Sequence, residues 1–298
     1  MCQLVTVSRA SYYRHLEVVL PDEAEMTARA AIQEVVLAHH RRYGYRRVSV
    51  DLRRRGIMIN HKRVLRIMRE DNLLAIRYRK YILTTDSRHD HQVYVNLAVR
   101  MTVTGINQLW IGDITYIRLR TEFVYLAVVI DRFSRRVIGW SLDRTLAARI
   151  VVTALQRAIE QRKPPPGVVV HNDQGVQYSS AEHNDVLQAN GMIASMSRPA
   201  NPYDNAACES FMKTLKQEEI YCNRYKDFEE LSAHLEEFLE AYYNRVRLHS
   251  ALGYRSPAEF ERDIAAELVS NPSPDAATMK YFTPNEPEKS TSDAPPAS

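Results

Sequence analysis

The sequence predicts an α/β domain preceded by a small all-α domain. From residue 106 onward, apolar residues alternate or run together as they do in strands, and helical patterns interrupt these segments. Between residues 21 and 76, apolar residues recur only at helical spacing. A length of 298 residues suits two domains of ordinary size, and 45% hydrophobic residues are enough to form a sizeable core.

Three short helices are predicted in the N-terminal part of the chain. The first covers residues 21–40 and starts with a proline and two acidic residues, which suit a first helical turn. The second covers residues 46–55, and the third covers residues 61–71 with Asn60 as its N-cap. Three short helices in this order predict a helix-turn-helix-like module over residues 21–76.

The following part of the chain predicts a mixed five-stranded sheet with helices. The fourth strand has no polar face, so we expect it to be buried on both sides. The expected strands are 110–119, 123–131, 135–142, 168–171 and 192–196, and the expected helices are 146–162, 180–190, 204–220 and 228–245. Three strands, then helix, strand, helix, strand and helix, is the order of a ribonuclease H-like α/β domain.

The composition divides the rest of the chain. Residues 1–20 are too few for a complete module and suit only part of a helix-turn-helix. Residues 77–104 have no sustained periodicity and are predicted to be a linker that lies on DNA. The ribonuclease H-like core is placed at residues 105–265. Residues 266–298 are predicted to be disordered, because they hold six of the 13 prolines and few apolar residues.

The charge of the chain is distributed unevenly. Between Arg29 and Lys80 there are 15 Lys and Arg against 4 Asp and Glu, whereas the whole chain carries only +4. A strongly basic N-terminal third joined to a mildly acidic remainder indicates binding to nucleic acid. A merely solvated charged face is the alternative interpretation.

Several classes of protein are excluded by motifs that are absent. Cys2, Cys208 and Cys222 cannot form a disulfide framework, and without a CxxC pair a zinc ribbon is not expected. Neither GxGxxG nor GxxxxGK[ST] occurs, which argues against the usual dinucleotide or P-loop ATP site. With no signal peptide and no apolar run of bilayer length, a cytoplasmic protein without membrane contact is predicted.

Three acidic residues occupy positions that suit catalysis. Asp113 lies within the first strand, Asp173 follows the buried fourth strand at the edge where open sheets place their sites, and Glu209 lies on the next helix but one. Three carboxylates that converge need a counter-charge, and Mg²⁺ prefers such oxygen ligands. We therefore expect Asp113, Asp173 and Glu209 to hold two Mg²⁺ ions, with Mn²⁺ as a substitute, for phosphoryl transfer.

The sequences around these acids resemble a known family. They read W-x-G-D-I-T-Y, H-N-D-Q-G-x-Q-Y-S-S and N-P-Y-D-N-A-x-x-E-S-F-x-K-T-L-K, and they are similar to the DDE transposases of bacterial insertion sequences, especially the OrfB type of the IS-three family in the retroviral integrase superfamily. Residues 39–47 and 242–257 resemble further family motifs, so that the likeness covers about residues 4–262. It implies an enzyme that cleaves the ends of an element and joins the freed 3′-hydroxyl to another DNA strand.

The resemblance also implies DNA contacts. Lys216 stands where the family has a basic residue that contacts terminal DNA, two helical turns after Glu209, while Lys213 and Asn205 are weaker candidates near the same face. His171 is an alternative phosphate contact or a histidine at the edge of the core. In the N-terminal module the candidate phosphate contacts are all basic: Arg41, Arg42, Arg46, Arg47, Arg53, Arg54, Arg55, Lys62 and Arg66.

Other functions and partners remain open at this point. A ribonuclease H or Holliday-junction type nuclease would use the same fold without strand transfer, and a DNA-binding regulator would need no catalysis. A retroviral-type integrase would need a zinc module that three scattered cysteines cannot supply. The resemblance implies a homo-oligomer on DNA, together with an upstream-frame OrfA product or an OrfA–OrfB fusion made by frameshifting.

Overall fold

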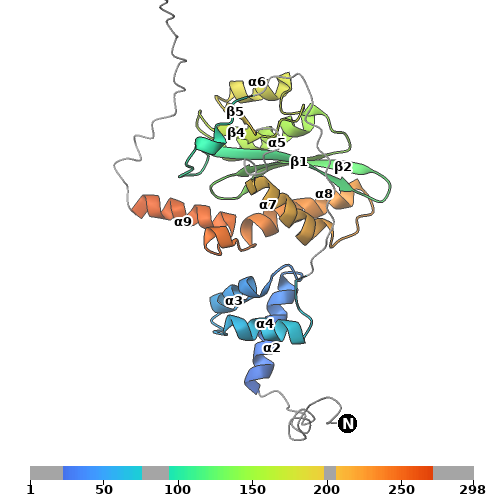
Figure 1. Cartoon of the computed structure of the whole chain (residues 1–298), viewed down its shortest axis with the longest axis vertical. Helices are drawn as coiled ribbons and strands as arrows, with labels where there is room; N and C mark the ends of the chain where they lie inside the picture. Colours follow the sequence, from blue (N-terminus) through green and yellow to red (C-terminus); the bar gives the residue numbers. More distant parts are fainter. Residues whose placement is uncertain (1–22, 76–93, 198–205, 271–298) are drawn as a thin grey trace, which may run out of the picture. The chain divides into compact units, whose positions relative to one another are not determined.

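The computed structural model describes residues 23–75, 94–197 and 206–270. The chain divides into two compact units, residues 1–80 and residues 81–298 (Figure 1). The expectations for residues 1–20, for the end of the chain beyond residue 270 and for Asn205 lie outside the described residues. Within the described ranges, no helix combines the length and apolar character needed to cross a membrane.

The first unit consists of three helices, as the sequence predicted. They are α2 (Glu23–Ala38), α3 (Tyr45–Arg54) and α4 (His61–Glu70). The side chain of Asn60 accepts a hydrogen bond from the Lys62 amide and so caps α4. The apolar face of each helix packs into one small core, whose fully buried members include Ile32, Val35, Val36, Val48, Leu52, Val64, Ile67 and Met68.

The second unit is built on a five-stranded mixed sheet in the order β3-β2-β1-β4-β5. The strands are β1 (Leu109–Arg118), β2 (Phe123–Asp131), β3 (Val137–Asp143), β4 (Val169–Asn172) and β5 (Ile193–Met196). The first three form an antiparallel meander, and β4 and β5 join it in parallel. Parallel neighbours require crossover connections, which the helices between the strands supply. The observed strand bounds lie within two residues of the predicted ones.

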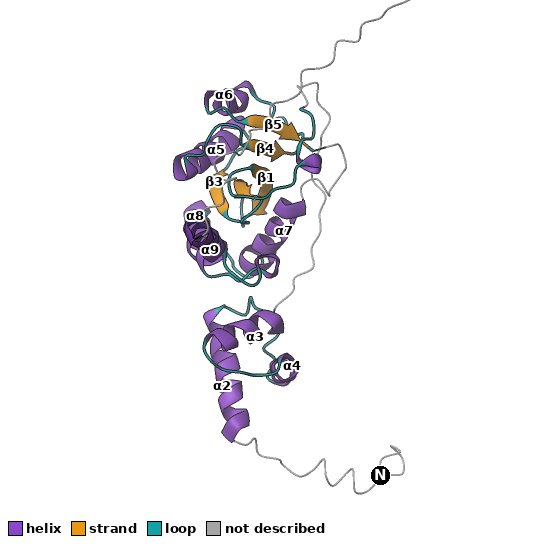
Figure 2. Ribbon diagram, turned by 90° about the vertical axis from the view of Figure 1, so that its left-hand side faces the viewer, coloured by secondary structure: helices purple, strands orange, loops and turns teal. Residues whose placement is uncertain are grey.

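Helices cover both faces of this sheet (Figure 2). On one face, α5 (Ala148–Arg162) and α6 (Ala181–Ala189) pack on a cluster that contains Trp110 and Val170. On the other face, α7 (Ala206–Leu215) and α8 (Phe228–Glu236) pack on a cluster that contains Leu109, Ile111 and Val169. Because both faces are covered, β4 is buried throughout, as its unbroken apolar pattern predicted.

Two predicted helices are α-helical in their first part and π-helical in their second part. The predicted helix 204–220 is α-helical in α7 and then π-helical in η3 (Lys216–Ile220), where the Tyr221 amide donates to the Lys216 carbonyl. The predicted helix 228–245 likewise passes from α8 into the π-helical η4 (Glu237–Tyr243). The apolar spacing of such short segments does not distinguish the two hydrogen-bond patterns, so the sequence alone could not predict the change.

Two predicted boundaries were wrong. Part of the predicted linker 77–104 belongs to the second unit, because the segment around the short helix η1 (Ala98–Arg100) packs apolar side chains on the core, and the Leu97 amide donates to Ser195. The predicted tail starts at residue 266, yet α9 (Pro257–Ser270) runs past that point. Both segments have a mixed composition, so the sequence does not define these boundaries. Tertiary packing decides the first boundary, and the continuation of α9 decides the second.

Candidate active site and DNA-binding surface

The strand register brings Asp113 and Asp173 to neighbouring positions. β1 and β4 run parallel, and Ile111 pairs with His171. Asp113 lies two residues after Ile111, and Asp173 lies two residues after His171. Continuing the same register therefore places Asp113 beside Asp173. The two carboxylates therefore lie at the carboxyl end of β4, as the sequence predicted.

The Asp113 carboxylate is strongly perturbed. Burial, and next the negative charge of Asp173, raise the pKa of Asp113 to about 7, and Glu209 adds a smaller effect in the same direction. Its Oδ1 accepts a hydrogen bond from the Ile114 amide at 2.9 Å, and Oδ1 of Asp173 accepts one from the Gly175 amide at 3.0 Å. Backbone amides thus orient both aspartates, while their mutual repulsion disfavours the doubly ionised pair.

Glu209 is the third acid, and its negative charge acts on Asp113 from α7. It lies in the first turn of α7, whose inner residues Cys208 and Phe211 are buried against the sheet, while Glu209 itself is exposed. Within the described residues, no three His, Cys, Asp or Glu side chains lie close enough together to hold a metal ion. Even so, carboxylate oxygens that repel one another in a partly buried site are a donor set that suits hard divalent cations.

At Gly112, next to Asp113, the backbone of β1 lies very close to the side chains of Asn172 and Tyr178. A Cβ added to Gly112 would overlap the side-chain oxygen of Asn172 and would lie 3.4 Å from the Tyr178 hydroxyl. Asn172 and Tyr178 are both buried, and the Tyr178 hydroxyl has no hydrogen-bond partner among the described residues. Glycine at this position therefore allows β1 and β4 to pair tightly beside the two aspartates. This role of Gly112 was not predicted, although the residue directly precedes Asp113 in the sequence.

The charge of Lys216 acts on Asp113. Lys216 is the first residue of η3, and its Nζ lies over the ring of Tyr116, 5.3 Å from the ring centroid. Burial lowers the pKa of Lys216, and the charge of Asp113 acts against that effect. Lys213 is exposed on α7. Tyr116 as a support for Lys216 was not predicted, because no sequence spacing indicates a contact between a strand and a helix 100 residues apart.

Two buried histidines have structural roles, and one of them, His171, was considered as a phosphate contact from the sequence. His171 is fully buried, and its ring nitrogens contact the hydroxyls of Ser195 at 2.9 Å and Ser197 at 3.1 Å. It therefore belongs to the core and not to the phosphate-binding surface. His249 is also buried and stacks edge-on against Tyr243 near the buried guanidinium of Arg247.

A buried ion pair fixes the helix that carries Glu209 and Lys216. Arg247 donates two hydrogen bonds of 2.7 Å to the Glu218 carboxylate, and their side chains are only 5% and 12% exposed. Arg247 also lies over the ring of Tyr243. A bidentate buried pair of this kind holds η3 against the C-terminal segment, and removing one partner would leave an uncompensated charge.

The basic residues of the first unit fall into two groups. Some are already bound within the protein: Arg66 pairs with Glu25 and Glu70, and Arg55 pairs with Asp51 and Glu34. Arg41 also belongs here, because it donates to the carbonyls of Asn72 and Leu74. These intramolecular bonds were not visible in the sequence, since most of the partners lie 21–41 residues away.

In the second group, Arg46, Arg53 and Lys62 have no carboxylate partner among the described residues. Arg46 contacts the hydroxyl and ring of Tyr45, whereas Arg53 and Lys62 are exposed and have no ion pair. Arg42, Arg47 and Arg54 complete the predicted set, and Arg47 lies over the ring of Tyr43. The exposed members lie on α3 and at the start of α4.

Comparison with known proteins places the chain in a family. The family described as integrase core domain matches residues 104–202, a second integrase core domain family matches residues 190–257, and the HTH-like domain family matches residues 22–81. The transposase for insertion sequence element IS904 of Lactococcus lactis subsp. lactis (strain IL1403) is 38% identical over 234 residues, which is 78% of this chain and 92% of that protein. Transposase InsF for insertion sequence IS3A of Escherichia coli (strain K12) is 37% identical over 266 residues, 88% of this chain and 92% of that protein.

Solved structures of integrases are also similar to the chain. The cryoEM structure of the simian T-cell lymphotropic virus intasome in complex with PP2A regulatory subunit B56 gamma has 16% identity and a TM-score of 0.45, covering 78% of this chain and 74% of that chain. The crystal structure of the catalytic core domain of BIV integrase has 17% identity and a TM-score of 0.41, covering 55% and 99%.

The chain belongs to the IS3-family transposases of bacterial insertion sequences, with an integrase core domain and an HTH-like domain. This confirms the family that the motifs around the three acids indicated. It also confirms the predicted ribonuclease H-like α/β fold preceded by a small helical domain.

Proposed function

We propose that the chain is a DDE transposase in which Asp113, Asp173 and Glu209 hold two divalent cations, Mg²⁺ or Mn²⁺. The observation that supports this most directly is the pKa of Asp113, which burial and the neighbouring Asp173 raise to about 7. A carboxylate is stable in such a place when a cation neutralises the pair. When bound, the cations activate the attacking oxygen and stabilise the leaving oxygen of an in-line phosphoryl displacement.

The protein's own groups have separate tasks in this reaction. The amides of Ile114 and Gly175 keep one oxygen of each aspartate fixed, so that the carboxylates are oriented before DNA arrives. Glu209 approaches from the first turn of α7 as the third carboxylate. Lys216, seated over Tyr116, offers its ammonium to a phosphate next to the scissile one.

The two units divide the work. The helical unit binds duplex DNA through basic residues on α3 and α4 that include Arg46, Arg53 and Lys62, and the integrase core carries out cleavage and joining. We propose that the enzyme acts in the bacterial cytoplasm as an oligomer assembled on the two element ends. An upstream-frame OrfA product, or its fusion with this chain, is proposed as the partner that completes recognition of the ends.

The test compares cleavage, joining and binding in the same variants. Asp113→Asn, Asp173→Asn and Glu209→Gln are each expected to abolish cleavage of labelled element ends and joining of the 3′-hydroxyl, because each removes ligand charge. DNA affinity should remain. Asp143→Asn, at an aspartate paired with Arg149 outside the site, is the matched control and should cleave normally.

Three outcomes would overturn the proposal. Near-normal cleavage by any one of the three variants would remove that residue from the site. Cleavage without any joining by the unmodified protein, in the presence of its upstream partner, would instead indicate a ribonuclease H-like nuclease. Binding without either reaction would indicate a DNA-binding regulator.

A further inference from the structure

The turn between β2 and β3 carries two arginines without a counter-charge. Among the described residues of the second unit, six arginines are buried or half-buried. Four of them bind carboxylates: Arg136 and Arg162 pair with Glu261, Arg247 with Glu218, and Arg255 with Asp263. The remaining two, Arg132 and Arg135, have no ion pair or side-chain hydrogen bond with any described residue.

The environment of this arginine pair is unfavourable to an isolated positive charge. Burial lowers the pKa of Arg135, and the positive charge of Arg132 lowers it further. Asp131 is the adjacent acid, but it is fully buried and turned toward the backbone, where it accepts hydrogen bonds from the amides of Asn107, Phe133 and Ser134. A half-buried guanidinium beside a like charge costs free energy unless an anion binds there.

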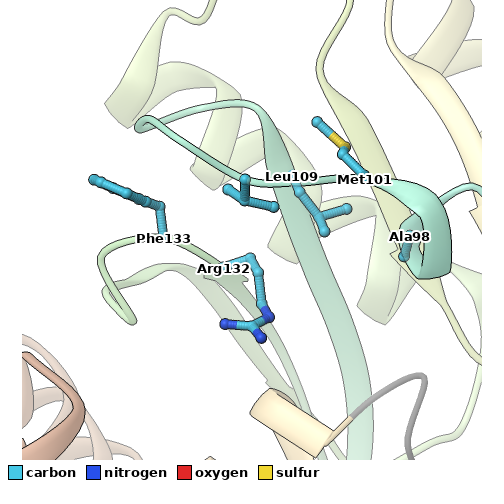
Figure 3. Close-up of a pocket in the computed structure, with 6 residues that line it drawn as sticks. Ala98, Met101, Leu109, Arg132 and Phe133 are labelled. Atoms are coloured by element: carbon cyan, nitrogen blue, oxygen red, sulfur yellow. The ribbon is translucent and has the colours of Figure 1, made fainter.

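A cavity lies beside Arg132. Its volume is about 210 Å³, and it is lined by Ala98, Met101, Val103, Leu109, Arg132 and Phe133. Figure 3 shows that the Arg132 side chain extends from the turn on the side of Leu109, while Phe133 points in a different direction. The cavity therefore offers one guanidinium, that of Arg132, and Arg135 belongs to the same turn without lining the cavity.

The cavity lies on the same face of the sheet as the catalytic aspartate. Leu109 and Asp113 are four residues apart on β1, so both side chains point to the face covered by α7. At about 3.3 Å per residue, the two positions are about 13 Å apart along the strand.

We propose that Arg132 and Arg135 form a phosphate-binding subsite for the backbone of the DNA that occupies the active site. Guanidinium groups bind phosphate through paired charge-assisted hydrogen bonds, and an anion here would relieve the repulsion between the two arginines. The subsite rests on the proposed function, since it takes its ligand from the DNA that reaches the acids. It contacts no base, so it acts on any sequence and serves to hold the DNA backbone at the turn between β2 and β3.

The experiment measures how the affinity of the full chain for duplex DNA depends on salt. The variants are Arg132→Gln with Arg135→Gln, and Arg132→Lys with Arg135→Lys as the charge-conserving pair. The probe is a duplex of about 30 base pairs without Mg²⁺, long enough to contact both units. Arg157→Gln is the matched control, because Arg157 is an exposed arginine on α5 at the opposite face of the sheet.

The glutamine pair is expected to weaken binding by about 10- to 100-fold, as charge-assisted hydrogen bonds to phosphate are lost. The slope of log affinity against log salt should fall by up to about two, which is the loss of two neutralised phosphates. The lysine pair should keep most of the slope, and Arg157→Gln should keep all of it. The melting temperature of the DNA-free glutamine pair should stay level or rise, because no internal partner is lost.

An unchanged slope and affinity in the glutamine pair would overturn the subsite. A loss of DNA affinity per arginine equal to that of Arg157→Gln would also overturn the subsite, because the weaker binding would then result from the lower net charge of the protein. If sedimentation shows that the pair loses self-association and keeps DNA binding, the arginines serve a protein interface and the subsite is wrong. Failure of the proposed catalytic function would be seen separately, as normal cleavage by Asp113→Asn.

Discussion

Replacing Asp113 by asparagine should stabilise the DNA-free enzyme in the absence of divalent cations. The raised pKa means that the folded protein retains a proton on Asp113 up to about pH 7, whereas the unfolded chain releases it near 3.8. Each pH unit between these values is worth about 1.36 kcal/mol. The stability that Asp113 provides is therefore fully present below about pH 4 and is lost as the pH rises to 7, by about 4 kcal/mol in all.

Asparagine removes this loss because it carries no charge at any pH. In urea unfolding with EDTA, Asp113→Asn and the unmodified protein should have similar free energies of unfolding near pH 4. The variant should gain steadily up to pH 7 and should be more stable by about 4 kcal/mol at pH 8. Asp143→Asn is a control of opposite sign, because Arg149 lowers the pKa of Asp143 to about 2. The stability that Asp143 provides is present above its ordinary value of 3.8, so this variant should lose stability at pH 8.

Cations should reverse the difference. Adding Mg²⁺ or Mn²⁺ at pH 8 should raise the melting temperature of the unmodified protein and should leave Asp113→Asn nearly unchanged, since a ligand that binds only the folded state stabilises it. The reasoning would be refuted if Asp113→Asn were no more stable than the unmodified protein at pH 8. It would be refuted equally if its advantage did not depend on pH between 4 and 7.

Three further predictions follow from single contacts. Lys216→Ala should keep the fold but weaken productive binding of element ends by about 1–3 kcal/mol in a cleavage assay at sub-saturating DNA, and unchanged cleavage would leave Lys216 as a surface lysine. Gly112→Ala should lower the melting temperature and reduce cleavage together, because its Cβ would overlap Asn172; normal values of both would show that β1 and β4 can separate locally without disturbing the aspartates. Arg53→Gln should reduce the salt slope of DNA binding by about one, whereas Arg66→Gln should mainly lower stability because Arg66 is held by two glutamates; equal slopes in both variants would contradict this division.

Local patterns of residues were enough to predict the order of strands and helices and the three candidate acids. The strand and helix order followed from apolar spacing, because a buried face must repeat every two or 3.6 residues whatever lies opposite it. Asp113, Asp173 and Glu209 could be chosen as the candidate acids for the same reason: each lies next to a recognisable strand or helix in a specific motif. These signals depend only on residues that are close together along the chain, so they can be detected in a single sequence.

Contacts between distant segments were decided only by the tertiary structure. The sequence could not show that Arg66 is bound by Glu25, 41 residues away, or that Tyr116 supports Lys216. It could not show that Arg132 and Arg135 have no carboxylate partner in the described part of the chain, because Glu261, which binds other arginines of the unit, comes from α9. The strength of each charge depends on burial and on neighbours in space, and neither is specified by spacing along the chain.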